Sequence, residues 1–510
     1  MAAVKQLAGQ TFWYGVSAVG AKFLNYLLVP LVTYLMRDPA GMAEYGNYNL
    51  IYGYFGLLNI IFTYGMETGF FRFNNKEDAF SKDDVFQTTF GSLLITTTLF
   101  CALIYFFRID LMHLIDFKGS SVIMLPFIGI LFFDTLSAIP FARLRLANRP
   151  KRYALIKLSN IITNIIFTVV FLVTPIYFKS SLPIGIQEFF DNYSQTFFLL
   201  LANAIASAIS FLFLIGEWKD VQFKINAPLW KQIIKYSAPM ILIGMAGMVN
   251  EVFDRQFLKY YYKGNEEETL RMIGIYSAVY KISIVITVFR TAFQMAAEPF
   301  FFKASQEKDA KTTYATVFKW FSITLTIAFL STALFLDIWK YFVNRSYWDG
   351  LYVVPFLLLA NICSGIYYNL SIWYKLTDRM YWGIIITLFG AVVTIIGNYY
   401  FIPTYGILAC AVTTFVCYFL MMVISYVIGQ KYYKVDYPIK SVGKYMFVML
   451  GITAIQLFLR NILGEHFSDT QSFFISLMSG IILLSLYVIM IVKQENVPLK
   501  KLPILNKIFK

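Results

Sequence analysis

Two stretches half a chain apart, YGNYNLIYG at residues 45–53 and IGIYSAVYK at residues 273–281, follow one pattern. In each copy a glycine is followed two positions later by a tyrosine and six positions later by another, which gives Gly46, Tyr48 and Tyr52 in the first copy and Gly274, Tyr276 and Tyr280 in the second. Position 46 corresponds to 274 and position 52 to 280, so the offset is a constant 228 residues in a chain of 510. The repetition predicts two halves built on one plan.

The composition is that of a membrane protein, because 58% of the residues are hydrophobic and only 14% are charged, against about 25% charged in soluble domains. A helix needs roughly 20 apolar residues to cross the hydrocarbon layer. About fourteen such runs occur, near residues 8–35, 46–70, 87–107, 121–141, 154–178, 195–216, 236–258, 273–302, 316–338, 351–374, 381–402, 405–429, 442–460 and 472–492. They are continuously apolar rather than alternating, which favours helices over barrel strands. The predicted fold is an all-α polytopic membrane protein with about 14 transmembrane helices.

Lysine and arginine indicate the orientation, because basic loops stay on the cytoplasmic side. With the N-terminus inside, about 29 of the 43 basic residues fall on inside segments, and the densest cluster is RLRLANRPKRY at residues 143–153. We therefore expect both termini in the cytoplasm and the chain in a bacterial cytoplasmic membrane. The net charge of +14 then faces anionic lipid, and no motif indicates nucleic acid as a partner.

The two copies of the pattern should run in the same direction across the membrane, because six crossings separate them. A parallel repeat relates two lobes by a pseudo-two-fold axis along the membrane normal, with a substrate path between them. We predict an N-terminal lobe of six helices at 1–225, a C-terminal lobe of six at 226–435, and two additional helices with a cytoplasmic tail at 436–510. The alternative is that the two stretches are unrelated aromatic anchors at the membrane interface.

The sequence gives little support for an enzyme. The four cysteines, Cys101, Cys363, Cys410 and Cys417, fall within predicted spans without metal-ligand spacing, which is typical of small buried apolar residues. The only two histidines, His113 and His466, lie far apart, which disfavours a catalytic histidine or a histidine-based metal site. The longest loops have about 15 to 20 residues, too few for a fused catalytic domain. We expect no cofactor and no metal.

Charged residues within spans are candidates for a transport path, because each costs roughly 2.5–3.5 kcal/mol at mid-membrane. On one continuous helix, four polar residues of the seventh span would share an arc of about 140°: Asn250, Glu251, Asp254 and Arg255. The alternative is a pair between Glu251 and Arg255 that only neutralises itself.

The eighth span carries Arg290, Gln294 and Glu298 as one stripe suited to line a cavity, with Lys281 about 180° away from Arg290. Lys22 in the first span and Asp134 in the fourth complete the deeply placed charges. Each of them could equally form a structural ion pair.

Several segments resemble the polysaccharide biosynthesis flippases of the Wzx type. They are QTFWYGVSAVGAKFLNYLLVPLVTYL at 10–35, NEVFDRQFLKYYY at 250–262, GIYSAVYKISIV at 274–285, AAEPFFFK at 296–303 and IPTYGILACAVTTFVCYFL at 402–420. The resemblance implies a carrier that translocates a lipid-linked oligosaccharide of the undecaprenyl-pyrophosphate type by alternating access, with twelve core helices. The superfamily also contains multidrug exporters and lipid II flippases, so cation-coupled export of a drug or of another lipid-linked precursor remains an alternative. An integral-membrane glycan polymerase is a further one.

This hypothesis assigns roles to the polar residues. Cations and hydrogen-bond donors would bind the pyrophosphate and the sugars. The residues expected to supply them are Arg290, Arg255, Lys22, Lys281, Gln294 and Asn250. Carboxylates could couple ion uptake to transport, from Glu251, Asp254, Glu298 and Asp134. Drug-exporter relatives have a carboxylate on the first helix, where this chain has Lys22 and Asn25, which favours an anionic cargo. The expected partners are the lipid-linked oligosaccharide, membrane lipids and other polysaccharide-assembly proteins.

Overall fold

In the computed structural model, all regular elements among the described residues are helices. The described residues are 26, 28–74, 80–117, 119–147, 149–218, 224–305, 309–377, 379–466 and 468–496. The chain forms two compact units, one of residues 1–278 with 380–417 and the other of residues 279–379 with 418–510. The lobe boundaries after residues 225 and 435 remain a prediction.

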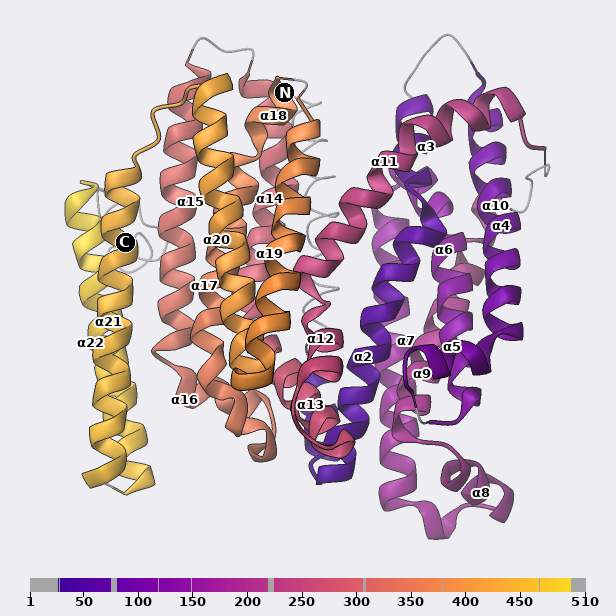
Figure 1. Ribbon diagram of the computed structural model, residues 1–510, viewed down its shortest axis with the longest axis horizontal. Coiled ribbons are helices and arrows are strands. Elements are labelled where there is room, and N and C mark those ends of the chain that lie inside the picture. Colours follow the sequence, from indigo (N-terminus) through magenta and orange to yellow (C-terminus); the bar gives the residue numbers. More distant parts are fainter. Residues whose placement is uncertain are drawn as a thin grey trace. The chain divides into compact units, whose positions relative to one another are not determined.

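The first unit is a bundle in which α6 is central, because it packs against α4 and α9, while α9 also packs along α7. Figure 1 shows these purple helices side by side. The unit contains α2 (Pro39–Thr63), α3 (Met66–Asn74), α4 (Lys82–Phe106), α5 (Arg108–Leu114), α6 (Met124–Leu146), α7 (Pro150–Tyr177), α8 (Ile184–Asn192), α9 (Gln195–Phe213), α10 (Ile215–Trp218), α11 (Ala227–Glu251), α12 (Asp254–Tyr261), most of α13 (Glu266–Ile282), α19 (Tyr381–Tyr405) and the start of α20 (Ile407–Tyr432).

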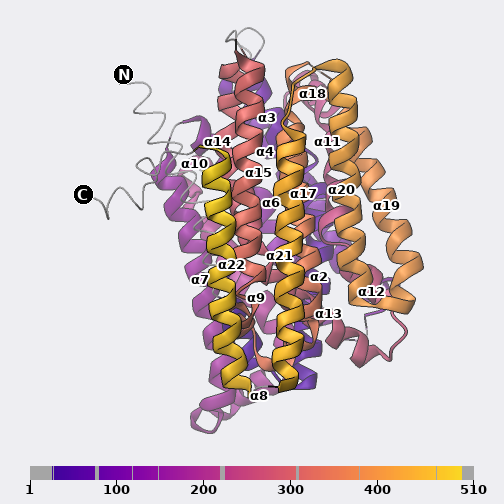
Figure 2. The same ribbon diagram turned by 90° about the vertical axis from the view of Figure 1, so that its left-hand side faces the viewer.

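The second unit is arranged around α15, which packs against α14, α17 and α21. Its helices are α14 (Ile284–Ala304), α15 (Ala310–Ala333), α16 (Leu336–Trp339), α17 (Val354–Leu370), α18 (Ile372–Leu376), the end of α20, α21 (Ile439–His466) and α22 (Asp469–Gln494). Figure 2 shows the yellow pair α21 and α22 beside α15.

Polar contacts hold the C-terminal helix pair, α21 and α22, against α15 within the second unit. The Tyr487 hydroxyl of α22 donates to Thr326 Oγ1 of α15 at 2.8 Å. Nearer the C-terminal end of α22, Glu495 accepts from Tyr445 at 2.7 Å and also pairs with Lys319 of α15. The two helices are therefore anchored by specific side chains as well as by apolar packing.

Several helix starts follow from local sequence. Ser81, Ser194 and Asn226 each accept a backbone hydrogen bond from the first turn of α4, α9 and α11, respectively. Proline occupies the first or second position of α2, α7, α11 and α17, where its missing N–H costs nothing. At the end of α2, Tyr64 and Gly65 have φ of 31° and 72°, and this left-handed turn separates α2 from α3.

Eleven helices among the described residues are long and apolar enough to span a membrane. They match eleven of the fourteen predicted runs, so the polytopic all-helical fold is confirmed. The run at 8–35 lies mostly outside the described residues. The runs at 46–70 and 273–302 are helical but interrupted, as α2 with α3 and α13 with α14.

The two copies of the glycine–tyrosine pattern lie against each other, where α2 crosses α13. A Cβ atom at Gly46 would lie 1.9 Å from the carbonyl oxygen of Leu270, and one at Gly274 would lie 2.3 Å from that of Met42. Residues 42 and 46 correspond to residues 270 and 274 at the same offset of 228. The contact of Gly46 with residue 270 is therefore equivalent to the contact of Gly274 with residue 42. The crossing has the local two-fold character that a repeat implies, and only glycine allows the backbones so close.

Candidate functional site

A buried ion pair stands at the start of α12. Arg255 Nη1 lies 2.9 Å from Asp254 Oδ1, and both residues are about 95% buried. Arg255 Nε donates to Ser277 Oγ at 3.0 Å, and the Tyr276 hydroxyl donates to Asp254 Oδ2 at 2.5 Å. This network ties α12 to α13 beside the glycine crossing. It satisfies the carboxylate from two sides, as a buried charge pair requires.

The seventh span differs from the continuous helix assumed for the sequence. α11 ends at Glu251, a turn at Val252 and Phe253 follows, and α12 begins at Asp254. Asn250 and Arg255 therefore lie on different helices, and the single polar face of about 140° is not formed. No glycine or proline marks this break, and Val252 ends α11 with φ of −130°.

Asn250 connects α11 to α19 instead of pointing into a shared polar face. Its side-chain amide donates to the carbonyl oxygen of Thr387 at 3.2 Å and accepts from the Thr394 hydroxyl at 3.3 Å. Glu251, the last residue of α11, is half-buried. Both residues remain predicted site residues.

Arg290 belongs to a buried polar seam between α14 and α17 in the second unit. Its Nη1 donates to Ser364 Oγ at 2.5 Å, and its guanidinium lies 5.3 Å from the ring centroid of Tyr368. One turn away, the Thr287 hydroxyl donates to Asn361 Oδ1 at 2.7 Å. Arg290 is only 6% exposed, so the structure places a guanidinium among hydroxyl, amide and aromatic groups inside a membrane-spanning bundle.

The structure describes only some of the other predicted residues of the eighth span and of the first. Gln294 follows Arg290 by one turn and is half-buried, and Lys281 is half-buried in the last turn of α13. Glu298 belongs to α14, but its side chain is not among those described, and Lys22 lies outside the described residues.

Asp134 of α6 is held within the first unit. It is hydrogen-bonded to Ser207 of α9 and interacts electrostatically with Lys157 of α7. The Lys157 ammonium lies 4.2 Å from the ring centroid of Phe141. These interactions involve residues of three helices, and Asp134 remains a predicted site residue.

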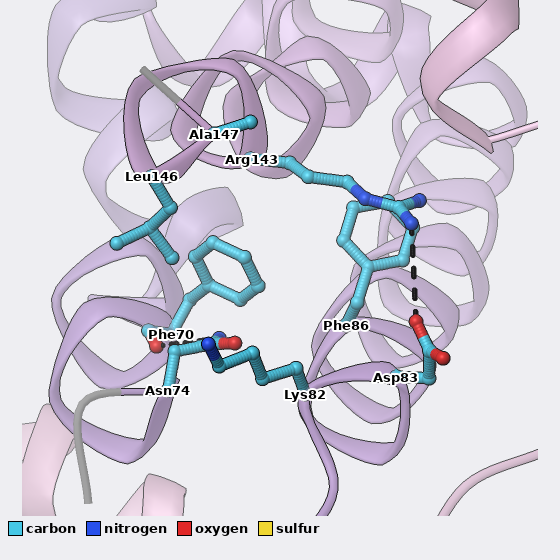
Figure 3. Close-up of a pocket in the computed structure, with 8 residues that line it drawn as sticks. All are labelled: Phe70, Asn74, Lys82, Asp83, Phe86, Arg143, Leu146 and Ala147. Atoms are coloured by element: carbon cyan, nitrogen blue, oxygen red, sulfur yellow. Dashed lines mark hydrogen bonds and ion pairs between the residues drawn. The ribbon is translucent and has the colours of Figure 1, made fainter.

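The structure also contains a pocket that the sequence did not predict (Figure 3). It has a volume of about 470 Å³ and lies at the end of α3, the start of α4 and the end of α6. Its lining consists of Phe70, Asn74, Lys82, Asp83, Phe86, Arg143, Leu146 and Ala147. Of these residues, Arg143 belongs to the basic cluster at 143–153 from which the orientation is predicted.

Three contacts hold the Arg143 side chain at this pocket. Its guanidinium lies 4.4 Å from the centroid of the Phe86 ring, Nη1 donates to the Glu217 carbonyl oxygen at 2.6 Å, and Nη2 lies 3.8 Å from Asp83. Nearby, Arg149 and Arg152 pair with the buried Glu217 carboxylate. Across the described part of the chain, no group of three or more His, Cys, Asp or Glu residues could hold a metal ion.

Comparisons with known proteins agree with this architecture. A family model described as polysaccharide biosynthesis protein matches residues 7–305. The solved structure of the lipid II flippase MurJ in an inward closed conformation superposes with a TM-score of 0.63 at 16% identity, over 96% of this chain and 98% of that one. The Vibrio cholerae MATE transporter VcmN in its bent form gives a TM-score of 0.52 at 12% identity, over 84% and 96%.

An outward-facing multidrug resistance MATE family transporter of the MOP superfamily gives a TM-score of 0.52 at 13% identity, over 86% of this chain and 96% of that one. At these identities the likeness concerns the fold. A search among curated protein sequences finds no match.

Proposed function

Because this chain belongs to the family of polysaccharide biosynthesis proteins, we propose that it is a flippase that moves a lipid-linked oligosaccharide across the bacterial cytoplasmic membrane. The cargo would be of the undecaprenyl-pyrophosphate type, carried by alternating access without making or breaking a covalent bond. The multi-pass helical fold, which is shared with MurJ and MATE transporters, supports a carrier.

The observation that carries this proposal is the burial of Arg290 in the polar seam of α14 and α17. A pyrophosphate head group that leaves water needs compensating charge and many hydrogen-bond donors. Arginine stays protonated and presents a planar fork that matches phosphate oxygens. The hydroxyl of Ser364 and the ring of Tyr368 hold the guanidinium in place, so we assign Arg290 to the cargo.

Arg255 has a different environment, which favours a positioning role. Its charge is compensated by Asp254, and Ser277 accepts from its Nε. We propose that this pair fixes α12 against α13 near the glycine crossing and affects the cargo only through that geometry.

Replacing Arg290 by alanine should reduce transport without preventing insertion. One lost charge-assisted contact is worth about 1.5–3 kcal/mol, or roughly ten- to a hundredfold in affinity. The measurement is translocation of a fluorescent lipid-linked oligosaccharide in proteoliposomes, normalised to folded protein. Arg290→Lys should recover part of the activity, because the charge remains while the fork is lost.

The matched control is Arg345→Ala, at an exposed arginine of the same unit, which should transport like the wild type. Wild-type transport by Arg290→Ala would rule out the cationic site. Movement of drug cations but of no glycolipid would favour the exporter alternative, whereas elongation of glycan chains would favour a polymerase.

The proposed orientation has a separate test. A tag inserted in the segment 143–153 should be protected from an impermeant reagent added outside intact cells, and a cysteine at Asn265 should be labelled, because basic loops stay inside. Outside labelling of the tagged segment would reverse the orientation.

A further inference from the structure

The pocket of Figure 3 lies at one boundary of the membrane-spanning region. α4 begins at Lys82 and α6 ends at Leu146, and both helices are candidate spans. The ends of two spans therefore frame the pocket at the depth where lipid head groups lie. Its cytoplasmic placement rests on the proposed function and on the orientation that goes with it.

The charges around the pocket favour an anion. Arg143 and Lys82 supply two cations, against one carboxylate, that of Asp83. The Asp83 side chain is 79% exposed and lies 3.8 Å from Arg143, so the pair is loose and contributes little. Among the residues that the structure describes, no carboxylate forms an ion pair with Lys82.

The arrangement of the side chains leaves room between the two cations. In Figure 3 the Lys82 chain extends toward Asn74 on one side, while the Arg143 guanidinium lies on the other side against Phe86. Phe70 and Phe86 meet edge to face with ring centroids 6.0 Å apart. A volume of about 470 Å³ lies within the range of small-molecule sites, and accommodates a phosphate with its adjoining sugar or glycerol.

We propose that this pocket binds the phosphate of an anionic lipid head group, with Arg143 and Lys82 as its cationic contacts. The aromatic rings and Leu146 provide the apolar wall against which the first part of the lipid packs. Basic pockets between spans on the cytoplasmic side suit this chemistry. The phosphate belongs either to the pyrophosphate of a lipid-linked cargo or to the phosphodiester of a membrane phospholipid.

Asp83 gives the proposal a distinctive signature, because it competes with the ligand for Arg143. Asp83→Asn removes that competitor and keeps the size of the side chain, so binding should become about two- to fivefold tighter. Arg143→Gln and Lys82→Gln should each weaken binding about tenfold or more. Lys151→Gln is the matched control, because it removes one charge from the same basic cluster at an exposed residue that does not line the pocket.

The experiment titrates the purified full-length protein with four probes by native mass spectrometry: dioctanoyl phosphatidylglycerol, dioctanoyl phosphatidylcholine, farnesyl pyrophosphate and inorganic pyrophosphate. The anionic lipids should bind more tightly than phosphatidylcholine. If Arg143→Gln and Lys82→Gln weaken the binding of farnesyl pyrophosphate alone, the pocket is an entry site for the cargo. If they weaken the binding of phosphatidylglycerol alone, the pocket is a phospholipid site. Equal dependence for both would identify a shared phosphate site.

Three outcomes would overturn the proposal: unchanged affinities in Arg143→Gln and Lys82→Gln, equal weakening in Lys151→Gln, or binding of inorganic pyrophosphate but of neither anionic lipid. Lys82 is exposed, so its substitution tests the site even where Arg143→Gln disturbs folding. Binding is measured without transport. A wild-type protein that binds anionic lipid at the pocket but does not flip glycolipid would therefore refute the proposed function and leave the pocket assignment standing. A protein that flips glycolipid but does not bind anionic lipid at the pocket would refute the pocket assignment and leave the proposed function standing.

Discussion

Alanine at Gly46 should force apart the two helices that cross at the repeat. Its Cβ atom would lie 1.9 Å from the carbonyl oxygen of Leu270, and such contacts essentially never fall below 3.0 Å. The helices must therefore separate by about 1.1 Å or more, because a backbone oxygen cannot rotate away. Overpacking costs about 1–3 kcal/mol, while replacing a helical glycine by alanine gains about 1 kcal/mol. We expect a net destabilisation of up to about 2 kcal/mol.

Gly274→Ala should have a smaller effect of the same sign, because its Cβ would lie 2.3 Å from the carbonyl oxygen of Met42. The double variant should cost less than the sum of the two. Both substitutions demand separation of the same helices, and after the first the second meets a wider gap. The assay is thermal and denaturant unfolding of the purified protein in detergent.

The matched control is Gly247→Ala in α11, where an added Cβ meets no atom within 4 Å. This variant should be neutral or more stable by about 0.5–1 kcal/mol. If Gly46→Ala is as stable as Gly247→Ala, or if the double variant is fully additive, the close crossing and the structural meaning of the repeat are refuted.

Two further predictions concern polar networks. Tyr276→Phe should destabilise the protein by about 1.5–3 kcal/mol, since it removes a donor from the buried carboxylate of Asp254. Tyr48→Phe, at the equivalent position of the first copy, is the control and should cost under about 1 kcal/mol. Equal losses of stability for the two variants, measured by denaturant unfolding, would contradict this prediction. Burial opposes ionisation of Asp337, but Arg460 and other neighbours outweigh it and lower the pKa of the carboxyl below its ordinary value of 3.8. The stability that this pair contributes should therefore be complete above that value and be lost as the pH falls through the lowered pKa. Wild-type thermal stability should fall more steeply below about pH 4 than that of Asp337→Asn, and parallel curves would contradict the assignment.

Most spans could be predicted from the sequence because an apolar run of about twenty residues has few alternatives in a membrane. The break between Glu251 and Asp254 could not, because no glycine or proline marks it. The network around Asp254 extends to Tyr276 and Ser277 on another helix. Helical periodicity indicates neighbours on the same helix, so it did not predict the pair between Arg255 and the adjacent Asp254.

The pocket could not be predicted from the sequence either, because it is formed by residues that are far apart in the chain. Its cations and aromatic rings come from the ends of three helices, and Lys82 and Arg143 are separated by most of two spans. A basic cluster gives an orientation from composition alone. Which of its members pair with acids depends on tertiary contacts, such as those of Arg149 and Arg152 with Glu217.

The two copies of the glycine–tyrosine pattern make equivalent backbone contacts but different side-chain contacts. At the crossing, Gly46 and Gly274 make equivalent contacts, yet the tyrosines that follow them differ. Tyr276 donates to a buried carboxylate, whereas Tyr48 packs among aromatic rings, with Tyr52 at 5.7 Å between centroids. Close backbone packing needs only glycine, so it can be kept in both copies, while a buried ion pair costs desolvation wherever it occurs. The second copy's Tyr276 and Ser277 hydrogen-bond to this pair, so the close backbone crossing and the charged chemistry meet different requirements.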